Sequence, residues 1–222
     1  MSAAPDKRIS ILISGRGSNM EAFLAAQQEQ SLSGSVVRVI SNRPSAAGLQ
    51  TAKAHGVPTA IVDHTQFDSR ESFDEALANV VAQDRPDAVV LAGFMRILTP
   101  IFINRFAGKL LNIHPSLLPK YPGLNTHKRA IESGDSEGGV TVHYVTNELD
   151  GGPPILQVRV PIHQGDTEVT LAARTLEYEH KIFPKAVNWH LEGRLYQHVD
   201  GAVLDGKKLS KCGAQWSSAE CV

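Results

Sequence analysis

Short apolar runs alternate with helix-like segments along the first half of this 222-residue chain, and this alternation restricts the fold more than any other feature. The first run, residues 9–14, is rich in β-branched residues and ends at a glycine turn, after which a helix-like pattern extends to about Gln30. Further strands are expected at 36–40, 59–62, 88–92 and 110–113, with helices at 46–55, from about 68 onward, and at 101–106. Strands that alternate with helices at this spacing form right-handed βαβ units. The sequence therefore predicts an α/β fold with a doubly wound, mostly parallel, Rossmann-type sheet.

The helix expected after residue 68 has both an entry signal and an apolar face. Asp68 stands three residues before Glu71, which is typical of a capping box. Phe73, Leu77, Val80 and Val81 fall on one helical face. We expect that face to pack on the sheet.

The pattern changes after Pro115. A short helix is expected at 128–133, a mobile loop at 135–139, and two strands at 140–145 and 155–160 that extend the sheet in an antiparallel sense. A long helix is expected at 167–193, an edge strand at 194–199, and a loosely ordered tail from Lys207. We predict a single domain over 1–222, with an N-terminal half at about 8–106, a C-terminal half at about 107–206 and the tail at 207–222.

Charge and cysteine content argue against several protein classes. The chain has 22 basic and 23 acidic residues and a net charge of −1, so no strong global field favours nucleic acid or a membrane surface. Cys212 and Cys221 both lie near the end, which argues against a disulfide framework. No apolar run approaches the ~18 residues of a membrane span, and residues 1–8 do not read as a signal peptide. A cytoplasmic protein is expected.

The glycine turn after the first strand resembles the start of a dinucleotide fingerprint, but Met20 occupies the place of the third glycine. No acidic residue follows the second strand at 40–44 to hold a nicotinamide ribose. Gly17, Ser18 and Asn19 would present backbone N–H groups and a hydroxyl at a helix N-terminus, which suits a single phosphate. A tight turn without a ligand is the alternative.

The most informative stretch contains Asn112 and His114, followed by Pro115. Side chains two apart on a strand share a face, so the amide and the imidazole should point the same way, while Ile113 points into the opposite layer. Proline cannot continue a central strand, which puts the pair at the carboxyl end, where α/β sheets bind ligands. The two groups could stabilise an oxyanion and exchange a proton. A hydrogen-bonded core asparagine with a structural histidine is the alternative.

Asp150 lies in a glycine-rich turn that could pass close to another element. Beside His114, its carboxylate would raise the histidine pKa; a turn-capping role is the alternative. The other histidines show no zinc-ligand spacing, and no Gly-x-Ser-x-Gly elbow is present. Neither a metal site nor an acyl-enzyme is therefore expected.

Five segments taken together resemble the phosphoribosylglycinamide formyltransferase family. They are Ser14-Gly-Arg-Gly-Ser-Asn19, Phe67-Asp-Ser-Arg70, Leu91-Ala-Gly-Phe-Met-Arg-Ile-Leu98, Asn112-Ile-His-Pro-Ser-Leu-Leu-Pro-Lys-Tyr-Pro-Gly123 and Glu148-Leu-Asp-Gly-Gly-Pro153. The resemblance covers the chain from Ile9 to about Leu209. It implies formyl transfer from 10-formyltetrahydrofolate, a cosubstrate rather than a tightly bound cofactor, to the amine of a phosphorylated glycinamide in purine synthesis.

The resemblance also implies a role for particular residues. Asn112, His114 and Asp150 would be catalytic. Gly17, Ser18, Asn19 and Glu179 would bind the ribonucleotide, and Thr141 and His143 would line the same cleft. The residues that would contact the folate are Arg70, Met95, Arg96, Ile97, Leu98 and Asn112. The expected partners are small molecules, with no nucleic acid and no membrane, and the protein would act as a monomer or a homodimer.

Three other functions share some of these features. A methionyl-tRNA formyltransferase would share the Asn-x-His and Asp signatures, but we expect it to have a further C-terminal domain and a basic face for RNA. A formyltetrahydrofolate deformylase would normally have an additional N-terminal domain, whereas here the first strand is expected near residue 8. A non-enzymatic nucleotide-binding module would keep the glycine turn but would have no reason to gather Asn112, His114 and Asp150.

Overall fold

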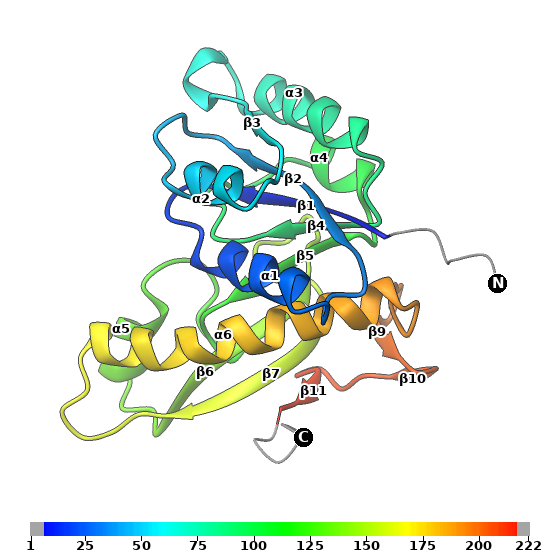
Figure 1. Cartoon of the computed structure of the whole chain (residues 1–222). Helices are drawn as coiled ribbons and strands as arrows, with labels where there is room; N and C mark the ends of the chain where they lie inside the picture. The colour runs from blue at the N-terminus through cyan, green and yellow to red at the C-terminus, as the bar shows by residue number, and fades with distance from the viewer. Residues whose placement is uncertain (1–6, 217–222) are drawn as a thin grey trace.

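A computed structural model describes residues 7–216, and its centre is an eight-stranded sheet. In chain order the strands of this sheet are β1 (Arg8–Ile13), β2 (Ser35–Ser41), β3 (Thr59–Ile61), β4 (Ala88–Leu91), β5 (Leu110–His114), β6 (Glu137–Tyr144), β7 (Pro154–Pro161) and β11 (Ala214–Gln215). In space their order is β11-β7-β6-β5-β4-β1-β2-β3 (Figure 1). The pairs from β3 to β5 are parallel, and β6 and β7 add antiparallel strands. The predicted doubly wound, mostly parallel sheet with antiparallel C-terminal strands is confirmed.

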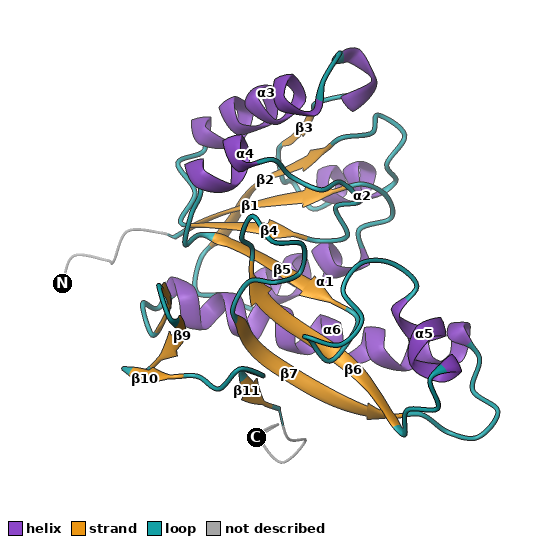
Figure 2. Ribbon diagram, turned by 180° about the vertical axis from the view of Figure 1, so that it is seen from behind, coloured by secondary structure: helices purple, strands orange, loops and turns teal. Residues whose placement is uncertain are grey.

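Helices cover both faces of the sheet (Figures 1 and 2). They are α1 (Ser18–Gln28), α2 (Gly48–Ala54), the 3-10 turn η1 (His64–Gln66), α3 (Arg70–Gln83), α4 (Pro100–Arg105), α5 (Thr126–Glu132) and α6 (Glu168–Leu191). Alternate residues of β1 show the division: Ile11 and Ile13 pack into the cluster with α1, α2 and α6, and Leu12 packs into the cluster with α3 and α4. The long helix α6 confirms the predicted C-terminal helix.

The start of α3 differs from the prediction. Ser69, not Asp68, is the N-cap, and its hydroxyl accepts a hydrogen bond from the Ser72 N–H at 3.1 Å. The Ser72 side chain in turn accepts from the Ser69 N–H, so the capping box is built from two serines. The box is thus shifted by one residue, and the Ser72 hydroxyl takes the place of the expected glutamate because it accepts from the N–H of the actual N-cap residue, Ser69. Phe73, Leu77 and Val81 are buried as expected.

The prediction of a mobile loop at 135–139 is wrong for its last three residues, because β6 begins at Glu137. Gly139 pairs with Arg159 of β7 and has a φ of 159°. A Cβ at Gly139 would lie 2.2 Å from the Val158 carbonyl oxygen and 2.5 Å from a Leu117 methyl group. Gly139 therefore allows close strand packing rather than mobility.

The loose tail predicted from Lys207 is wrong for the described residues. A second sheet joins β8 (Leu195–His198), β9 (Gly201–Leu204) and β10 (Lys207–Lys208), so the strand expected at 194–199 forms here and not in the main sheet. Asp205 and Gly206 connect β9 to β10 with φ values of 50° and 75°, as a tight hairpin requires. Further on, β11 pairs parallel to β7. Cys221 lies outside the described residues.

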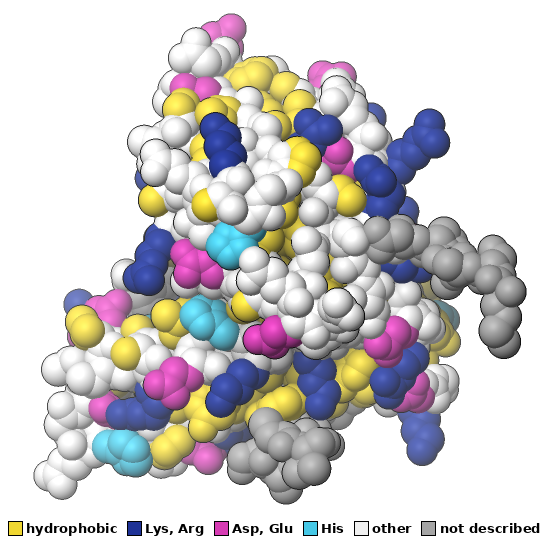
Figure 3. All heavy atoms as spheres, viewed as in Figure 1, with side chains coloured by type: hydrophobic (Ala, Val, Ile, Leu, Met, Phe, Trp, Pro, Cys, Tyr) yellow, Lys and Arg dark blue, Asp and Glu magenta, His cyan; other side chains and the backbone are white. Residues whose placement is uncertain are grey.

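Charged side chains of both signs are interspersed over the face seen in Figure 3. This mixture agrees with the net charge of −1. Among residues 7–216, no helix is both long and apolar enough to cross a membrane.

Candidate active site

The carboxyl end of the parallel strands gathers the polar residues that the sequence singled out. Across the sheet, Leu12 pairs with Leu91, Leu91 with Asn112, and Asn112 with His143. The glycine turn follows β1, and the Ala92-Gly93 turn follows β4. Strand order reverses at β1, because β2 and β3 lie on one side of it and β4 and β5 on the other, and such switch points are where open α/β sheets bind ligands.

Asn112 and His114 lie on the same face of β5, as predicted. Leu111 and Ile113 belong to the cluster with α6, whereas Leu110 belongs to the cluster with α3 and α4. Asn112 and His114 have the same parity as Leu110 and therefore point to that second side. Asn112 is half-buried, and His114 is buried.

Asp150 lies beside His114, although 36 residues separate them along the chain. Asp150 Oδ2 is 3.4 Å from His114 Nδ1. The other ring nitrogen, Nε2, is 2.9 Å from the Tyr121 carbonyl oxygen, which can only accept, so Nε2 carries a proton and donates it. Both ring nitrogens thus face acceptor oxygens.

The turn around Asp150 is held tightly in place. Asp150 Oδ2 accepts a hydrogen bond from the Gly123 N–H at 2.8 Å, and Asp150 itself has a φ of 51°. A Cβ at Gly152 would lie 1.8 Å from the Tyr144 carbonyl oxygen. Only glycine fits at that position, so Gly152 allows the turn to approach β6 and brings the carboxylate to His114.

His143 orients the Asn112 amide. Its Nδ1 is 2.9 Å from the Tyr144 carbonyl oxygen and therefore donates. Burial lowers the pKa of His143 to about 4, so the ring is neutral at pH 7 and Nε2 keeps a lone pair. Asn112 Nδ2 lies 3.2 Å from this nitrogen and donates to it. Asp150 Oδ1 is 3.8 Å from His143 Nε2. The two form no ion pair, because the His143 ring is neutral and this nitrogen presents a lone pair.

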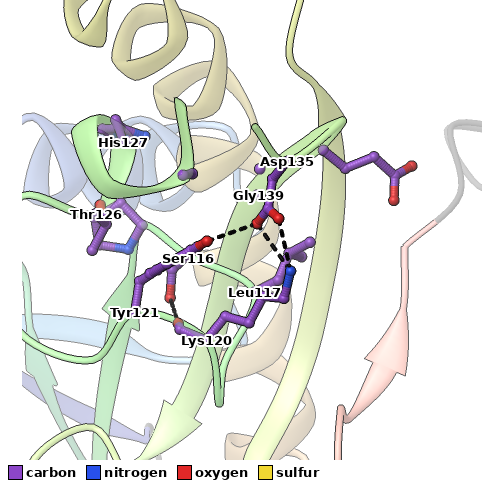
Figure 4. Close-up of a pocket in the computed structure, with 12 residues that line it drawn as sticks. Ser116, Leu117, Lys120, Tyr121, Thr126, His127, Asp135 and Gly139 are labelled. Atoms are coloured by element: carbon purple, nitrogen blue, oxygen red, sulfur yellow. Dashed lines mark hydrogen bonds and ion pairs between the residues drawn. The ribbon is translucent and has the colours of Figure 1, made fainter. Parts of the chain in front are cut away.

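Hydrogen bonds and an ion pair hold the segment that provides the Tyr121 carbonyl (Figure 4). Asp135 accepts from Lys120 at 2.9 and 3.0 Å and from the Tyr121 hydroxyl at 3.0 Å. The Lys120 ammonium lowers the pKa of Asp135, which keeps the carboxylate charged. Ser116 Oγ donates to the Lys120 carbonyl at 2.6 Å. These bonds fix the backbone whose Tyr121 carbonyl accepts the hydrogen bond from the His114 ring.

Thr141 was predicted to line the cleft, but in the structure it does not. Its side chain is fully buried and its hydroxyl is saturated: it donates to the Ser116 carbonyl at 2.7 Å and accepts from the Leu118 N–H and from Gln157 Nε2. The residue instead ties β6 to the segment after β5. Alternation along β6 could have indicated that Thr141 and His143 share a face, but it could not show that Ser116 and Leu118 cover the threonine.

The glycine turn borders a cavity at the same carboxyl edge of the sheet. Gly17 has a φ of 77° and precedes α1, and Ser18 and Asn19 form the first residues of that helix. Residues 14–19 line a cavity of about 300 Å³ together with Arg43, Ala92, Gly93 and Met95. Glu179 of α6 reaches this turn, because its Oε2 accepts from Asn19 Nδ2 at 2.7 Å. Burial raises the pKa of Glu179.

The segment predicted to contact folate follows β4. Met95 and Ile97 are 68% and 56% exposed, and Met95 lines the cavity, whereas Leu98 is buried against α3 and α4. Arg70 Nη2 donates to the Ile97 carbonyl at 2.6 Å, and the Arg96 guanidinium lies 4.9 Å from the centroid of the Phe73 ring. The structure therefore brings Arg70, Met95, Arg96 and Ile97 together, but the Leu98 side chain points into the core.

Sequence reasoning missed Ser14 and Arg43. Ser14 Oγ accepts from the Met95 N–H at 2.8 Å and donates to Asn42 Oδ1 at 2.6 Å, which links the turn to the segment after β4. The only available signal was their position directly after β1 and β2. Residues 7–216 contain no group of three or more His, Cys, Asp or Glu side chains arranged to hold a metal ion.

Comparison with known proteins gives consistent results. Residues 7–187 match the family model described as formyl transferase. The chain is 50% identical to phosphoribosylglycinamide formyltransferase of Escherichia coli over 92% of this chain and 97% of that protein. It resembles the solved phosphoribosylglycinamide formyltransferase of Coxiella burnetii with a TM-score of 0.91 and 44% identity, over 96% of this chain and all of that one. A formyltetrahydrofolate deformylase of Pseudomonas syringae is 28% identical with a TM-score of 0.83, and the match covers 90% of this chain and 66% of that one.

Proposed function

Because the chain belongs to the formyl transferase family, we propose that it transfers the formyl group of 10-formyltetrahydrofolate to the amine of 5-phosphoribosylglycinamide. The products would be 5-phosphoribosyl-N-formylglycinamide and tetrahydrofolate, in the third step of de novo purine synthesis. The observation that supports this most is the convergence of Asn112, His114 and Asp150 beside a cavity that could hold a phosphate.

The proposed reaction is a direct transfer. The glycinamide amine attacks the formyl carbon, and its electron pair forms the new C–N bond while negative charge moves to the formyl oxygen. The intermediate then collapses, the bond to the folate nitrogen breaks, and that nitrogen takes a proton as the amine loses one. No covalent enzyme intermediate is needed, and catalysis comes from positioning and electrostatics.

Asn112 and His114 would stabilise the oxyanion. One N–H of the Asn112 amide is used by His143 Nε2, and the second remains to donate to the developing negative charge. His114, held between the Tyr121 carbonyl and Asp150, would supply positive charge and an exchangeable proton. Asp150 would stabilise the protonated ring.

The two substrates would occupy neighbouring parts of the same edge. Gly17, Ser18 and Asn19 would bind the ribonucleotide phosphate at the N-terminus of α1, and Glu179 would help to hold the sugar side of that substrate. Met95, Arg96, Ile97 and Arg70 would contact the folate, with the Leu98 side chain supporting the segment from below. We further propose a cytoplasmic protein that acts as a monomer or a homodimer on small molecules, without a tightly bound cofactor.

A product assay tests the reaction. Purified protein is mixed with 10-formyltetrahydrofolate and, in separate reactions, with glycinamide ribonucleotide, charged initiator tRNA or no acceptor, and products are identified by mass spectrometry. We expect formylation of the ribonucleotide alone. Formate release in the reaction without an acceptor, at the rate of formyl transfer expected with the ribonucleotide, would support a deformylase. Formylated tRNA would support a tRNA formyltransferase. Either result would refute the proposal.

A further inference from the structure

The cavity beside the glycine turn contains two cationic side chains to which the proposed function assigns no role. Arg16 and Arg43 both line it, and both are exposed. Within residues 7–216, neither guanidinium forms a hydrogen bond or an ion pair. No aspartate or glutamate lines this cavity. Two unpaired guanidinium groups at a helix N-terminus create a positive potential in a space of about 300 Å³.

The backbone that presents Arg43 is already fixed. Ser41 Oγ accepts from the Arg43 N–H and donates to the Arg43 carbonyl, both at 3.0 Å. The neighbouring Asn42 is buried, and its Oδ1 accepts from Ser14 Oγ at 2.6 Å. Only the arginine side chain remains to be ordered when a ligand arrives, which lowers the entropic cost of binding.

The glycine turn is tied to the same frame. Gly48, at the start of α2, donates its N–H to the Gly15 carbonyl oxygen at 3.1 Å. A Cβ at Gly48 would lie 2.8 Å from the Arg16 carbonyl oxygen, so the turn packs directly on that helix. Arg16 and Arg43 therefore extend from two segments whose backbones are held in place relative to each other.

A second observation in this cavity points to a ligand. Asn19 is 8% exposed, and within the described residues its Oδ1 is buried and has no hydrogen-bond partner. Its Nδ2 is occupied by Glu179. An unpaired buried acceptor is unfavourable unless a bound molecule brings a donor, such as a sugar hydroxyl.

We propose that Arg43, assisted by Arg16, recognises the phosphate of the ribonucleotide and makes this protein selective for the phosphorylated substrate. Guanidinium groups bind phosphate oxygens with two parallel hydrogen bonds, which backbone N–H groups alone do not provide. This inference rests on the proposed function, because it takes the cavity to be the ribonucleotide phosphate site. Arg43 acts in binding and leaves the chemistry at Asn112 and His114 unchanged.

The test compares substrates with and without the phosphate. Arg43→Ala, Arg43→Lys and Arg16→Ala are assayed with glycinamide ribonucleotide and with its dephosphorylated riboside. Lys53→Ala serves as the matched control, because Lys53 is an exposed cation of α2 that does not line the cavity. We expect Arg43→Ala to raise KM for the ribonucleotide roughly tenfold, which corresponds to about 1.4 kcal/mol. Arg16→Ala should raise it by a smaller factor, and Arg43→Lys should recover part of the loss.

The same variants should leave kcat, KM for 10-formyltetrahydrofolate and kcat/KM for the riboside unchanged, and Lys53→Ala should resemble wild type throughout. An equal loss of kcat/KM for ribonucleotide and riboside in Arg43→Ala would overturn the proposal, since it would indicate a structural role for the loop. So would an unchanged KM for the ribonucleotide.

Titration with inorganic phosphate separates this inference from the proposed function. We expect calorimetry to give a Kd for phosphate about tenfold higher in Arg43→Ala than in wild type. If wild type fails to formylate the ribonucleotide, the proposed function is wrong, yet this titration still decides whether Arg43 binds phosphate. Equal phosphate affinity in both proteins would refute the role of Arg43.

Discussion

The buried imidazole of His143 should make stability depend on pH in a measurable way. Burial lowers its pKa from 6.5 to about 4. As pH falls below about 6.5, the unfolded chain binds a proton at this residue that the folded chain refuses, so the free energy of unfolding decreases. The contribution is fully present above pH 6.5 and is lost progressively down to about pH 4. Between pH 7.5 and pH 5 the loss should be about 2 kcal/mol.

His143→Gln isolates this contribution from the other titrating groups. A glutamine can still accept the hydrogen bond from Asn112 but does not titrate in this range. We expect the difference in unfolding free energy between wild type and His143→Gln to change by about 2 kcal/mol over that pH range, as measured by urea unfolding at several pH values. Parallel pH curves for the two proteins would refute the reasoning.

The same residue should affect turnover through Asn112. His143→Leu removes the acceptor that orients the amide, whereas His143→Gln retains one. At pH 7.5 we expect kcat to fall about tenfold in the leucine variant and to change much less in the glutamine variant. Equal losses in both variants would mean that shape, rather than the accepted hydrogen bond, determines the effect.

Three further outcomes are expected. His114→Ala and Asp150→Asn should each lower kcat at least about 10²-fold with unchanged circular dichroism, and near-normal turnover would remove that residue from the mechanism. Arg70→Ala should raise KM for the folate about tenfold more than KM for the ribonucleotide, since its guanidinium holds the Ile97 carbonyl; the reverse preference in steady-state kinetics would contradict its placement. Gly152→Ala should lower the free energy of unfolding by about 2 kcal/mol or more, because the alanine methyl group would clash with the Tyr144 carbonyl. Gly15→Ala is the control, since a Cβ there would meet nothing within 4 Å. Equal denaturation midpoints for the two variants would be inconsistent with the clash.

Local patterns determined the general architecture. Apolar runs such as 9–14 and 88–92 could only be buried strands between helices, and the fold follows from right-handed connection of such units. The same period of two placed Asn112 and His114 on one face of β5. These inferences succeeded because each depends on residues close together in the sequence.

Local patterns failed where a neighbour distant in sequence completed the structure. Residues 207–216 have little periodicity of their own, and their strands form by pairing with β9 and β7. The Asp205-Gly206 hairpin signal was present in the sequence and could have predicted β10. The parallel pairing of β11 with β7 had no such signal.

The sequence by itself determined the sheet, the shared direction of Asn112 and His114, and the availability of a glycine-flanked carboxylate. Only the tertiary structure decided that Asp150 lies 3.4 Å from His114 and that a neutral His143 orients Asn112. The physical reason is that periodicity fixes which way a side chain points from its own element. Charge, hydrogen bonding and protonation depend on groups that the fold brings from elsewhere in the chain.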